Sequence, residues 1–361
     1  MKIGIIGLPN AGKSTVFNAL AAAGAEVQKH PFTTIEPNLG MVPVPDPRLG
    51  RLGEIFAPER LVPATIKFVD IAGLVEGASR GEGMGNQFLA AIRETDALVQ
   101  TVRCFVDDSV AHVMGKADPV RDLETVRAEL YLADLETVER RLEKVSRGRT
   151  SDPAKDREER ELLEALRDRL AAGESLREGD LAGRAREVLP DLGLLTLRPV
   201  ICLANTGEDE ASSGPDLLSA LREQARSDGV ELIEVSGRLE AELAGLEEDD
   251  REAFRKELGL EGSGLERLVE AARKTLNLVS FFTKEGVEVR AWMIPAGTPA
   301  RSAAGIIHSD MEEGFIRAEV VSFEALDRAG GLAEVKGRGE LRIEGRDYVV
   351  REGDVIRFLF K

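Results

Sequence analysis

The chain has 361 residues, of which 43% are hydrophobic and 31% charged, and its formal net charge is −17. This length predicts about two or three domains, and the strong negative charge argues against broad binding to DNA, RNA or anionic lipid. Only 4% of the residues are aromatic, and no apolar run approaches the roughly 20 residues of a membrane span, so we expect a cytoplasmic protein without a DNA or membrane partner.

Short apolar runs alternate with helical patterns along the first two thirds of the chain. Residues 2–6 have the pattern of a buried strand, and residues 13–23 follow with apolar side chains at helical spacing. Further runs of the buried-strand type lie at residues 66–70, 97–102, 200–204 and 230–235. Strands that alternate with helices predict an α/β domain with a mainly parallel sheet covered on both faces. Cys104 and Cys202 lie beside or within two of these strands and are expected to be buried, reduced thiols.

A phosphate-binding loop lies between the first predicted strand and the first predicted helix. Residues 7–14, Gly-Leu-Pro-Asn-Ala-Gly-Lys-Ser, fit the pattern G-x-x-x-x-G-K-[S/T] in the strand–helix context that the motif requires. The backbone N–H groups of such a loop surround phosphate oxygens, while Lys13 reaches the β- and γ-phosphates and Ser14 ligates Mg²⁺. Asn10 is a candidate ligand for a monovalent cation, K⁺, beside the phosphates. The expected nucleotide contacts are Asn10, Ala11, Gly12, Lys13, Ser14 and Thr15.

Two other segments complete the expected contacts to the metal and the γ-phosphate. Asp70 ends the second predicted strand, and Gly73 follows it in the pattern Asp-Ile-Ala-Gly. After a phosphate-binding loop, Asp70 would hold Mg²⁺ through water, and the Gly73 N–H would contact the γ-phosphate. Residues 30–37 read His-Pro-Phe-Thr-Thr-Ile-Glu-Pro, and a loop threonine here can complete the Mg²⁺ coordination and release it after hydrolysis. We prefer Thr34 over Thr33 for that ligand.

The group that orients the attacking water is a separate question. Leu74 follows Gly73, at the position where a Ras-like enzyme carries glutamine. Because an apolar side chain cannot orient water, intrinsic hydrolysis is expected to be slow, or another group must substitute. His112 is a candidate, since it lies in a loop-like stretch after a sheet strand, on the side where such folds bind nucleotides. His112 could equally be a surface or packing histidine. With Lys13 and Gly73 it completes the candidate catalytic set.

The region from about residue 120 to 187 is dense in charged residues, with leucine recurring at helical spacing. The segment Thr150-Ser151-Asp152-Pro153 interrupts this pattern. We predict two long antiparallel helices, which form a coiled-coil-like hairpin inserted into the nucleotide domain. The interspersed charges are interpreted as solvated helix faces.

The segment that would recognise the base reads Ala-Asn-Thr-Gly-Glu at residues 204–208, where regulatory GTPases carry Asn-Lys-x-Asp. The lysine that covers the base is absent, and glutamate replaces the aspartate that accepts both guanine N–H groups. Asn205 could pair with the N6/N7 edge of adenine, whereas Glu208 could still serve guanine, so both bases remain open. Thr206 and Ser236 are further candidate contacts, Ser236 through the backbone over the base.

After about residue 278 the chain takes on strand-like alternation. Residues 287–294 and 315–320 alternate, and residues 348–360 are interpreted as two strands joined by a tight Glu-Gly-Asp turn. These patterns predict a small β-rich domain at residues 278–361 without catalytic residues. It would follow a nucleotide-binding domain at residues 1–277 that contains the helical insertion.

Together these motifs resemble the Obg-like ATPase (YchF) family of TRAFAC-class P-loop NTPases. The resemblance covers essentially the whole chain and rests on Gly-Leu-Pro-Asn-Ala-Gly-Lys-Ser-Thr, Pro-Phe-Thr-Thr-Ile-Glu-Pro-Asn, Asp-Ile-Ala-Gly-Leu-Val, Asn-Thr-Gly-Glu and Tyr-Val-Val-Arg-Glu-Gly-Asp. It implies a GTPase-type fold that prefers ATP, with residues 205–208 in the specificity position, Leu74 replacing the catalytic glutamine, and His112 as a catalytic loop histidine. It also implies a C-terminal β-grasp-like TGS domain and a ribosome or ribosomal subunit as partner in translation or stress responses.

The predicted function is that of an Mg²⁺-dependent ATPase acting as a slow nucleotide switch on a ribosome-associated partner. Two alternatives stay open: an Obg-type GTPase in ribosome function, and a scaffold whose bound nucleotide is barely hydrolysed. Equilibrium binding of ATP and GTP distinguishes the first alternative. Hydrolysis that stays at the background rate with ribosomes and potassium present would favour the second.

Overall fold

The structure, a computed structural model, describes residues 1–25, 38–73, 84–107, 109–147, 153–177, 179–207, 215–260 and 262–361. The chain forms two compact units: residues 1–40 with 67–268, and residues 41–66 with 269–361. The sequence predicted one boundary, at residue 278, and gave no sign that residues 41–66 leave the nucleotide domain. The structure therefore groups this early segment differently from the prediction.

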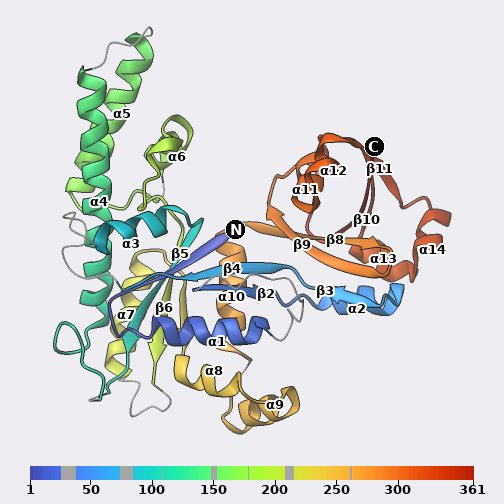
Figure 1. The fold of residues 1–361 in the computed structure, drawn as a ribbon, viewed down its shortest axis with the longest axis horizontal. Helices are drawn as coiled ribbons and strands as arrows, with labels where there is room; N and C mark the ends of the chain where they lie inside the picture. Colours follow the sequence, from blue (N-terminus) through green and yellow to red (C-terminus); the bar gives the residue numbers. More distant parts are fainter. Residues whose placement is uncertain are drawn as a thin grey trace. The chain divides into compact units, whose positions relative to one another are not determined.

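A mainly parallel sheet forms the centre of the first unit (Figure 1). Its strand order is β2-β4-β1-β5-β6-β7, and the pairs β1–β4, β1–β5, β5–β6 and β6–β7 are all parallel. The strands are β1 (Lys2–Ile6), β2 (Leu39–Pro43), β4 (Thr65–Asp70), β5 (Ala97–Cys104), β6 (Val200–Thr206) and β7 (Leu232–Val235). Every residue of β5 is buried, as expected for a central strand covered on both faces. The predicted mainly parallel sheet is confirmed.

The helices of the first unit follow the strands in the predicted alternation. They are α1 (Lys13–Ala25), α3 (Met84–Arg93), α4 (Pro119–Arg147), α5 (Pro153–Ala171), α6 (Asp180–Val188), the short 3₁₀ helix η2 (Pro190–Leu192), α7 (Pro215–Ser227), α8 (Gly237–Leu243), α9 (Glu248–Glu257) and α10 (Gly264–Thr275), whose residues from 269 on belong to the second unit. Leu89 of α3 and Leu130 of α4 pack with Ile6 and Leu98 of the sheet in one apolar cluster. This packing leaves the carboxyl ends of the strands for loops. Of the described helices, none is both long enough and apolar enough to cross a membrane.

The predicted helical insertion is present as α4 and α5, which lie side by side (Figure 1). Val138 of α4 packs there against Leu162, Leu166 and Leu170 of α5 in a buried leucine-rich seam. The prediction extended the second helix to residue 187, which is wrong, because α5 ends at residue 171 and α6 is separate. Gly173 has a φ of 71°, a left-handed conformation that stops a helix and that glycine adopts without strain.

The interpretation of the charges in this region as solvated faces is wrong for one side of α4. Asp122, Glu129 and Asp134 are all buried. Asp134 accepts hydrogen bonds from the Leu195 N–H at 2.9 Å and from the Thr196 N–H and hydroxyl at 2.8 and 2.7 Å. A buried carboxylate is tolerated when its oxygens are satisfied in this way. Some of the charged residues of α4 therefore make structural hydrogen bonds instead of facing solvent.

The two cysteines are buried, as predicted. Cys104 lies at the end of β5 and Cys202 in β6, and both are free thiols. Burial raises the pKa of both, that of Cys202 to about 12. Because the thiolate is the reactive form, both residues act as packing groups.

The second unit is built on its own sheet, with the order β11-β10-β12-β8-β9-β3. Its strands are β3 (Arg60–Val62), β8 (Leu278–Glu285), β9 (Glu288–Pro295), β10 (Phe315–Ser322), β11 (Arg342–Glu344) and β12 (Asp354–Phe360). Its helices are α2 (Pro47–Phe56), α11 (Ala300–Ile307), α12 (Ser309–Glu313), α13 (Phe323–Ala329) and α14 (Leu332–Gly337). Consecutive side chains of β8 serve opposite faces, with Phe281 in one apolar core and Phe282 in the other.

Residues 41–66 belong to this unit because β3 joins its sheet and α2 buries apolar side chains in its core. Strand β3 pairs with β9 in parallel, with Leu61 opposite Val289. Leu52 of α2 is fully buried and packs in the same core as Phe282. The sheet thus takes its edge strand from a segment more than two hundred residues upstream.

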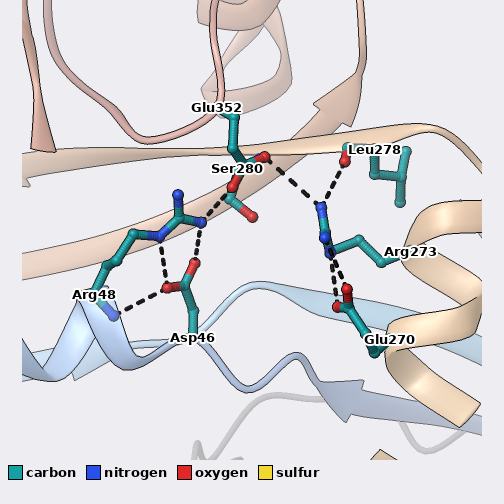
Figure 2. A network of polar contacts seen from close by, with 7 residues as sticks. All are labelled: Asp46, Arg48, Glu270, Arg273, Leu278, Ser280 and Glu352. Atoms are coloured by element: carbon teal, nitrogen blue, oxygen red, sulfur yellow. Dashed lines mark hydrogen bonds and ion pairs between the residues drawn. The ribbon is translucent and has the colours of Figure 1, made fainter. Parts of the chain in front are cut away.

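A polar network reinforces this attachment (Figure 2). Arg48, on α2, donates to the carboxylate of Asp46 at 2.7 and 2.8 Å and also to Glu352. The second oxygen of Glu352 accepts the Ser280 N–H at 2.9 Å and lies 3.8 Å from a guanidinium nitrogen of Arg273. Hydrogen bonds to Asp46 and Glu352 raise the pKa of Arg48, so this guanidinium stays charged and links α2 to the C-terminal strands.

The predicted hairpin over residues 348–360 is only half correct. Residues 354–360 form β12, but residues 348–350 do not pair with it. Their backbone instead bonds to residues 298–300, because Val350 N–H donates to Thr298 at 3.0 Å and Ala300 N–H donates to Tyr348 at 2.7 Å. Both edges of β12 are already taken by β10 and β8, which leaves no edge for a preceding strand.

Candidate functional site

The loop between β1 and α1 has the backbone that the phosphate-binding motif requires. Gly7 has a φ of 150° and Gly12 a φ of 90°, conformations that glycine adopts without a steric penalty. A Cβ at Gly7 would lie 2.4 Å from the Thr101 carbonyl oxygen, and one at Gly12 would lie 2.0 Å from Asn205 Nδ2. Helix α1 begins at Lys13, so its N-terminal N–H groups and the positive end of its dipole face this loop.

Lys13 is a buried cation at the mouth of the loop. Its side chain is 6% exposed, and Nζ donates to the Leu8 carbonyl at 2.8 Å. Burial lowers the pKa of Lys13 to about 8, while the nearby charge of Asp70 offsets part of that effect. A single carbonyl, the one hydrogen-bond partner of Nζ in the part of the chain that the structure describes, is a weak partner for a buried ammonium group, so this group is well placed to gain from an anionic ligand.

Ser14 and Asp70 lie together next to Lys13. The Ser14 hydroxyl donates to Asp70 Oδ2 at 2.6 Å, and Asp70 Oδ1 is buried without a hydrogen-bond partner in the described residues. An orphaned carboxylate oxygen beside a hydroxyl is the oxygen-ligand set that suits Mg²⁺, which keeps several waters and phosphate oxygens as its other ligands. The residues present therefore fit the predicted metal.

Gly73 lies close against the same lysine. A Cβ at this position would be 3.0 Å from Lys13 Nζ and 3.1 Å from the Pro9 Cα and nitrogen atoms. This contact places the Gly73 backbone beside the phosphate-binding loop, where the prediction needs it. Three other predicted site residues, Thr34, Leu74 and Glu208, lie outside the described residues, and their roles stay predictions.

Asn205 braces the loop from the end of β6. Its side chain is 4% exposed. Nδ2 donates to the Ala11 carbonyl at 3.0 Å, and Oδ1 accepts the Gly237 N–H at 3.0 Å. The amide therefore joins the phosphate-binding loop to the start of α8, a role that sequence reasoning missed because both partners are backbone groups. Pairing of Asn205 with an adenine edge stays a prediction.

The remaining predicted contacts lie around this brace. Thr206 ends β6 and is half-buried, and Thr15 is exposed in the first turn of α1. Ser236 caps α8, with its hydroxyl accepting the Leu239 N–H at 3.4 Å. The structure brings these residues to the same loops as Asn205, and their contacts to a nucleotide stay predictions.

His112 lies in the loop between β5 and α4 with both ring nitrogens engaged. Nδ1 accepts the Met114 N–H at 3.1 Å, and Nε2 lies 2.7 Å from Asp122 Oδ2. Because Nδ1 acts as an acceptor, the proton sits on Nε2 and is donated to Asp122. The residue before it is tied to the phosphate-binding loop, since Asn10 Nδ2 donates to the Ala111 carbonyl at 3.0 Å. Binding of K⁺ by Asn10 and catalysis by His112 stay predictions.

Two family models match the chain, one described as a 50S ribosome-binding GTPase at residues 2–138 and YchF-GTPase_C, described as a protein of unknown function (DUF933), at residues 278–361. The "Ribosome-binding ATPase YchF" of Escherichia coli O157:H7 is 47% identical over 359 residues, which cover 99% of each chain. Its namesake from Bacillus subtilis (strain 168) is 46% identical over 99% of this chain and 98% of its own. The solved "Structure of the Schizosaccharomyces pombe YchF GTPase" is 34% identical, with a TM-score of 0.89 over 99% of this chain and 97% of that one.

Proposed function

This chain belongs to the YchF family, and on that premise we propose that it is an Mg²⁺-dependent ATPase that binds ribosomes and acts as a slow nucleotide switch. The observation that carries this proposal is the meeting of Lys13, Ser14 and Asp70 at the phosphate-binding loop. The names of the two bacterial relatives, each a ribosome-binding ATPase, support the choice of nucleotide and partner. A role in translation or stress responses in the cytoplasm is part of the same proposal.

The reaction is in-line attack of water on the γ-phosphate, with catalysis by positioning and charge neutralisation. Lys13 would exchange its bond to the Leu8 carbonyl for the β- and γ-phosphates. The N–H groups at the start of α1 and the Gly73 N–H would hold the phosphate oxygens in place. Ser14, Asp70 and Thr34 would hold Mg²⁺, which supplies Lewis-acid neutralisation of the phosphate charge. K⁺ beside Asn10 would add to that neutralisation.

Turnover is expected to be slow because neither of the two candidate positions, residues 74 and 112, offers a free group for the water. Leu74 stands in the glutamine position and is apolar. His112 can orient the water only after Nε2 leaves Asp122. We assign His112 this role once its side chain has left Asp122, while the backbone of its loop stays in place, a change that a ribosomal partner would favour.

The residues that would distinguish adenine from guanine are 205–208 and Ser236. Asn205 uses its amide on two backbone groups, so any adenine contact must come from the remaining amide N–H, from Thr206 or from Glu208. A GTPase is the second candidate, favoured by the name of the yeast relative, a GTPase, and by the description of the N-terminal family model. In that case Glu208 would accept the guanine N–H groups.

A competition titration separates these candidates. ATP, GTP, ADP and GDP compete with a fluorescent adenine nucleotide in the presence of Mg²⁺. We expect adenine nucleotides to bind at least about tenfold more tightly, a difference of about 1.4 kcal/mol. A preference for guanine nucleotides of the same size would contradict the ATPase assignment and establish the GTPase.

The affinity for nucleotide is expected to fall as the pH rises above about 8. The free protein holds Lys13 at a lowered pKa of about 8, whereas bound phosphates favour its charged form and raise that pKa. At a pH between the pKa of Lys13 in the free protein and its pKa in the complex, binding requires Lys13 to take up a proton. The dissociation constant should therefore rise by up to about tenfold per pH unit in this range. Below pH 8 the protonation of Lys13 should leave the dissociation constant unchanged, because Lys13 is charged in both the free and the bound protein.

Isothermal calorimetry checks this expectation with ATP at pH 7.0 and 9.0, in buffers of different ionisation enthalpy. Close to one proton should be taken up per nucleotide at the higher pH. The variant Lys13→Met should show no uptake from this group. Equal uptake by wild type and variant would show that another group is responsible.

A further inference from the structure

Arg103 is a buried arginine whose hydrogen bonds, within the described residues, all go to backbone carbonyls. It lies near the end of β5, and its side chain is 3% exposed. Buried arginines usually pair with carboxylates, because a charge out of water needs compensation. Within the described residues Arg103 forms no ion pair, and its hydrogen bonds go to the backbone of the loop that follows it. This side chain is therefore dedicated to holding a loop.

The guanidinium holds three carbonyls of a six-residue stretch. Nε donates to Phe105 at 3.3 Å, Nη2 to Asp107 at 3.0 Å and Nη1 to Val110 at 2.9 Å. Its plane lies over the Phe105 ring, with Cζ 4.5 Å from the centroid. The planar fork thus binds three carbonyls of this loop at once, and the cation–π contact supplies compensation for the buried charge.

The end of this stretch is tied to the phosphate-binding loop and leads into His112. Asp107 Oδ1 accepts the Ser109 N–H and hydroxyl at 2.8 and 2.6 Å, which tightens the loop. The next carbonyl after the stretch, that of Ala111, accepts Asn10 Nδ2 at 3.0 Å. Arg103 and Asn10 therefore hold two consecutive carbonyls, those of residues 110 and 111, directly before His112.

We propose that Arg103 is a positioning residue for hydrolysis, which holds the 105–112 loop against the phosphate-binding loop so that His112 is presented to the reaction. This inference rests on the proposed role of His112. Arg103 touches neither nucleotide nor water in this scheme, and its effect passes through the loop backbone. The expected signature is a lower turnover rate with unchanged nucleotide affinity.

The decisive variant is Arg103→Lys, which keeps the positive charge and removes the fork. A lysine offers one ammonium group, and that group cannot bond three carbonyls that lie around a planar guanidinium. We expect kcat for ATP to fall about ten- to hundredfold, while the dissociation constant for ATP stays within about twofold. Hydrogen exchange of the amides at residues 109–115 should speed up by about tenfold or more, because local opening becomes easier.

Arg198→Lys is the matched control. Arg198 also donates to backbone carbonyls, those of Arg93 and Thr95, but it precedes β6, at the opposite end of that strand from Asn205. Its loss of hydrogen bonds should lower the melting temperature and leave kcat intact, which shows what a purely structural defect looks like. A comparable loss of kcat in both variants would overturn the positioning role.

His112→Ala, measured in the same assays, separates this inference from the proposed function. Loss of turnover in His112→Ala with full turnover in Arg103→Lys overturns the inference and leaves the proposed function standing. Full turnover in His112→Ala overturns the proposed role of His112. It also overturns the inference for Arg103, because that inference depends on His112. Unchanged exchange at residues 109–115 in Arg103→Lys overturns the anchoring itself.

Discussion

Replacement of Lys13 by alanine is expected to weaken the binding of Mg²⁺-ATP by about a hundredfold or more, a loss of about 2.8 kcal/mol. The side chain is buried and, within the described residues, has one carbonyl as hydrogen-bond partner beside the nearby charge of Asp70, so its charge gains most of its compensation when phosphate is bound. Burial already lowers its pKa in the free protein, which means that the folded state gains nothing from this charge. The variant should therefore lose affinity without losing much stability.

Equilibrium titration with a fluorescent ATP analogue measures the affinity, and a melting curve without nucleotide measures the stability. Lys2→Ala is the control, since Lys2 lies in β1 of the same sheet with a side chain that is 43% exposed. It should bind ATP as the wild type does. Near-wild-type affinity in Lys13→Ala would refute the assignment of residues 7–14 as the phosphate-binding loop.

The nucleotide side of the fold could be predicted because its signals are local. Residues 2–6 and 13–23 carry strand and helix patterns on either side of a glycine motif, and the structure has β1 and α1 there. Asp70 ends its strand as expected, and it meets Ser14 because β1 and β4 are parallel neighbours in the sheet. Periodicity and spacing are enough for such features, since each depends on consecutive residues.

The second unit could be predicted only in part, because its sheet is assembled from distant segments. Strand β3 has three residues, too few for a periodic pattern, and its partner β9 lies far along the chain. Residues 348–350 looked like a strand before a turn, but their backbone bonds to residues 298–300. Neither pairing leaves a local trace in the sequence.

The contacts that organise the site were equally hidden from sequence reasoning. Asn205 was a candidate contact to the base, which stays a prediction, and nothing in the sequence indicated that its amide joins two backbone groups of separate loops. Asp122 sits in a stretch interpreted as solvated, yet it is buried and holds His112. Arg103 lies in a largely apolar strand, where an arginine indicates a buried guanidinium that bonds to backbone carbonyls. Side chains that bond to backbone leave no complementary residue to look for.

Gly12→Ala is expected to destabilise the first unit by about 2–6 kcal/mol and to abolish tight nucleotide binding. Gly12 has a φ of 90° and the added Cβ would lie 2.0 Å from Asn205 Nδ2. Backbone strain contributes about 1–3 kcal/mol of the loss. Displacement of the Asn205 amide from the Ala11 carbonyl leaves buried polar groups unpaired and contributes about as much again.

Urea titration of the nucleotide-free protein measures this loss, with Gly183→Ala as the matched control. Gly183 lies in α6, and nothing lies within 4 Å of the position that its Cβ would take, so alanine there should be neutral or add up to about 1 kcal/mol. The double variant Gly12→Ala with Asn205→Ala tests the cause. If the collision with Asn205 matters, the double variant should lose clearly less than the sum of the two single losses, because each single change already breaks the same brace. Additive losses would mean that strain at residue 12 acts alone and that Asn205 does not hold the phosphate-binding loop.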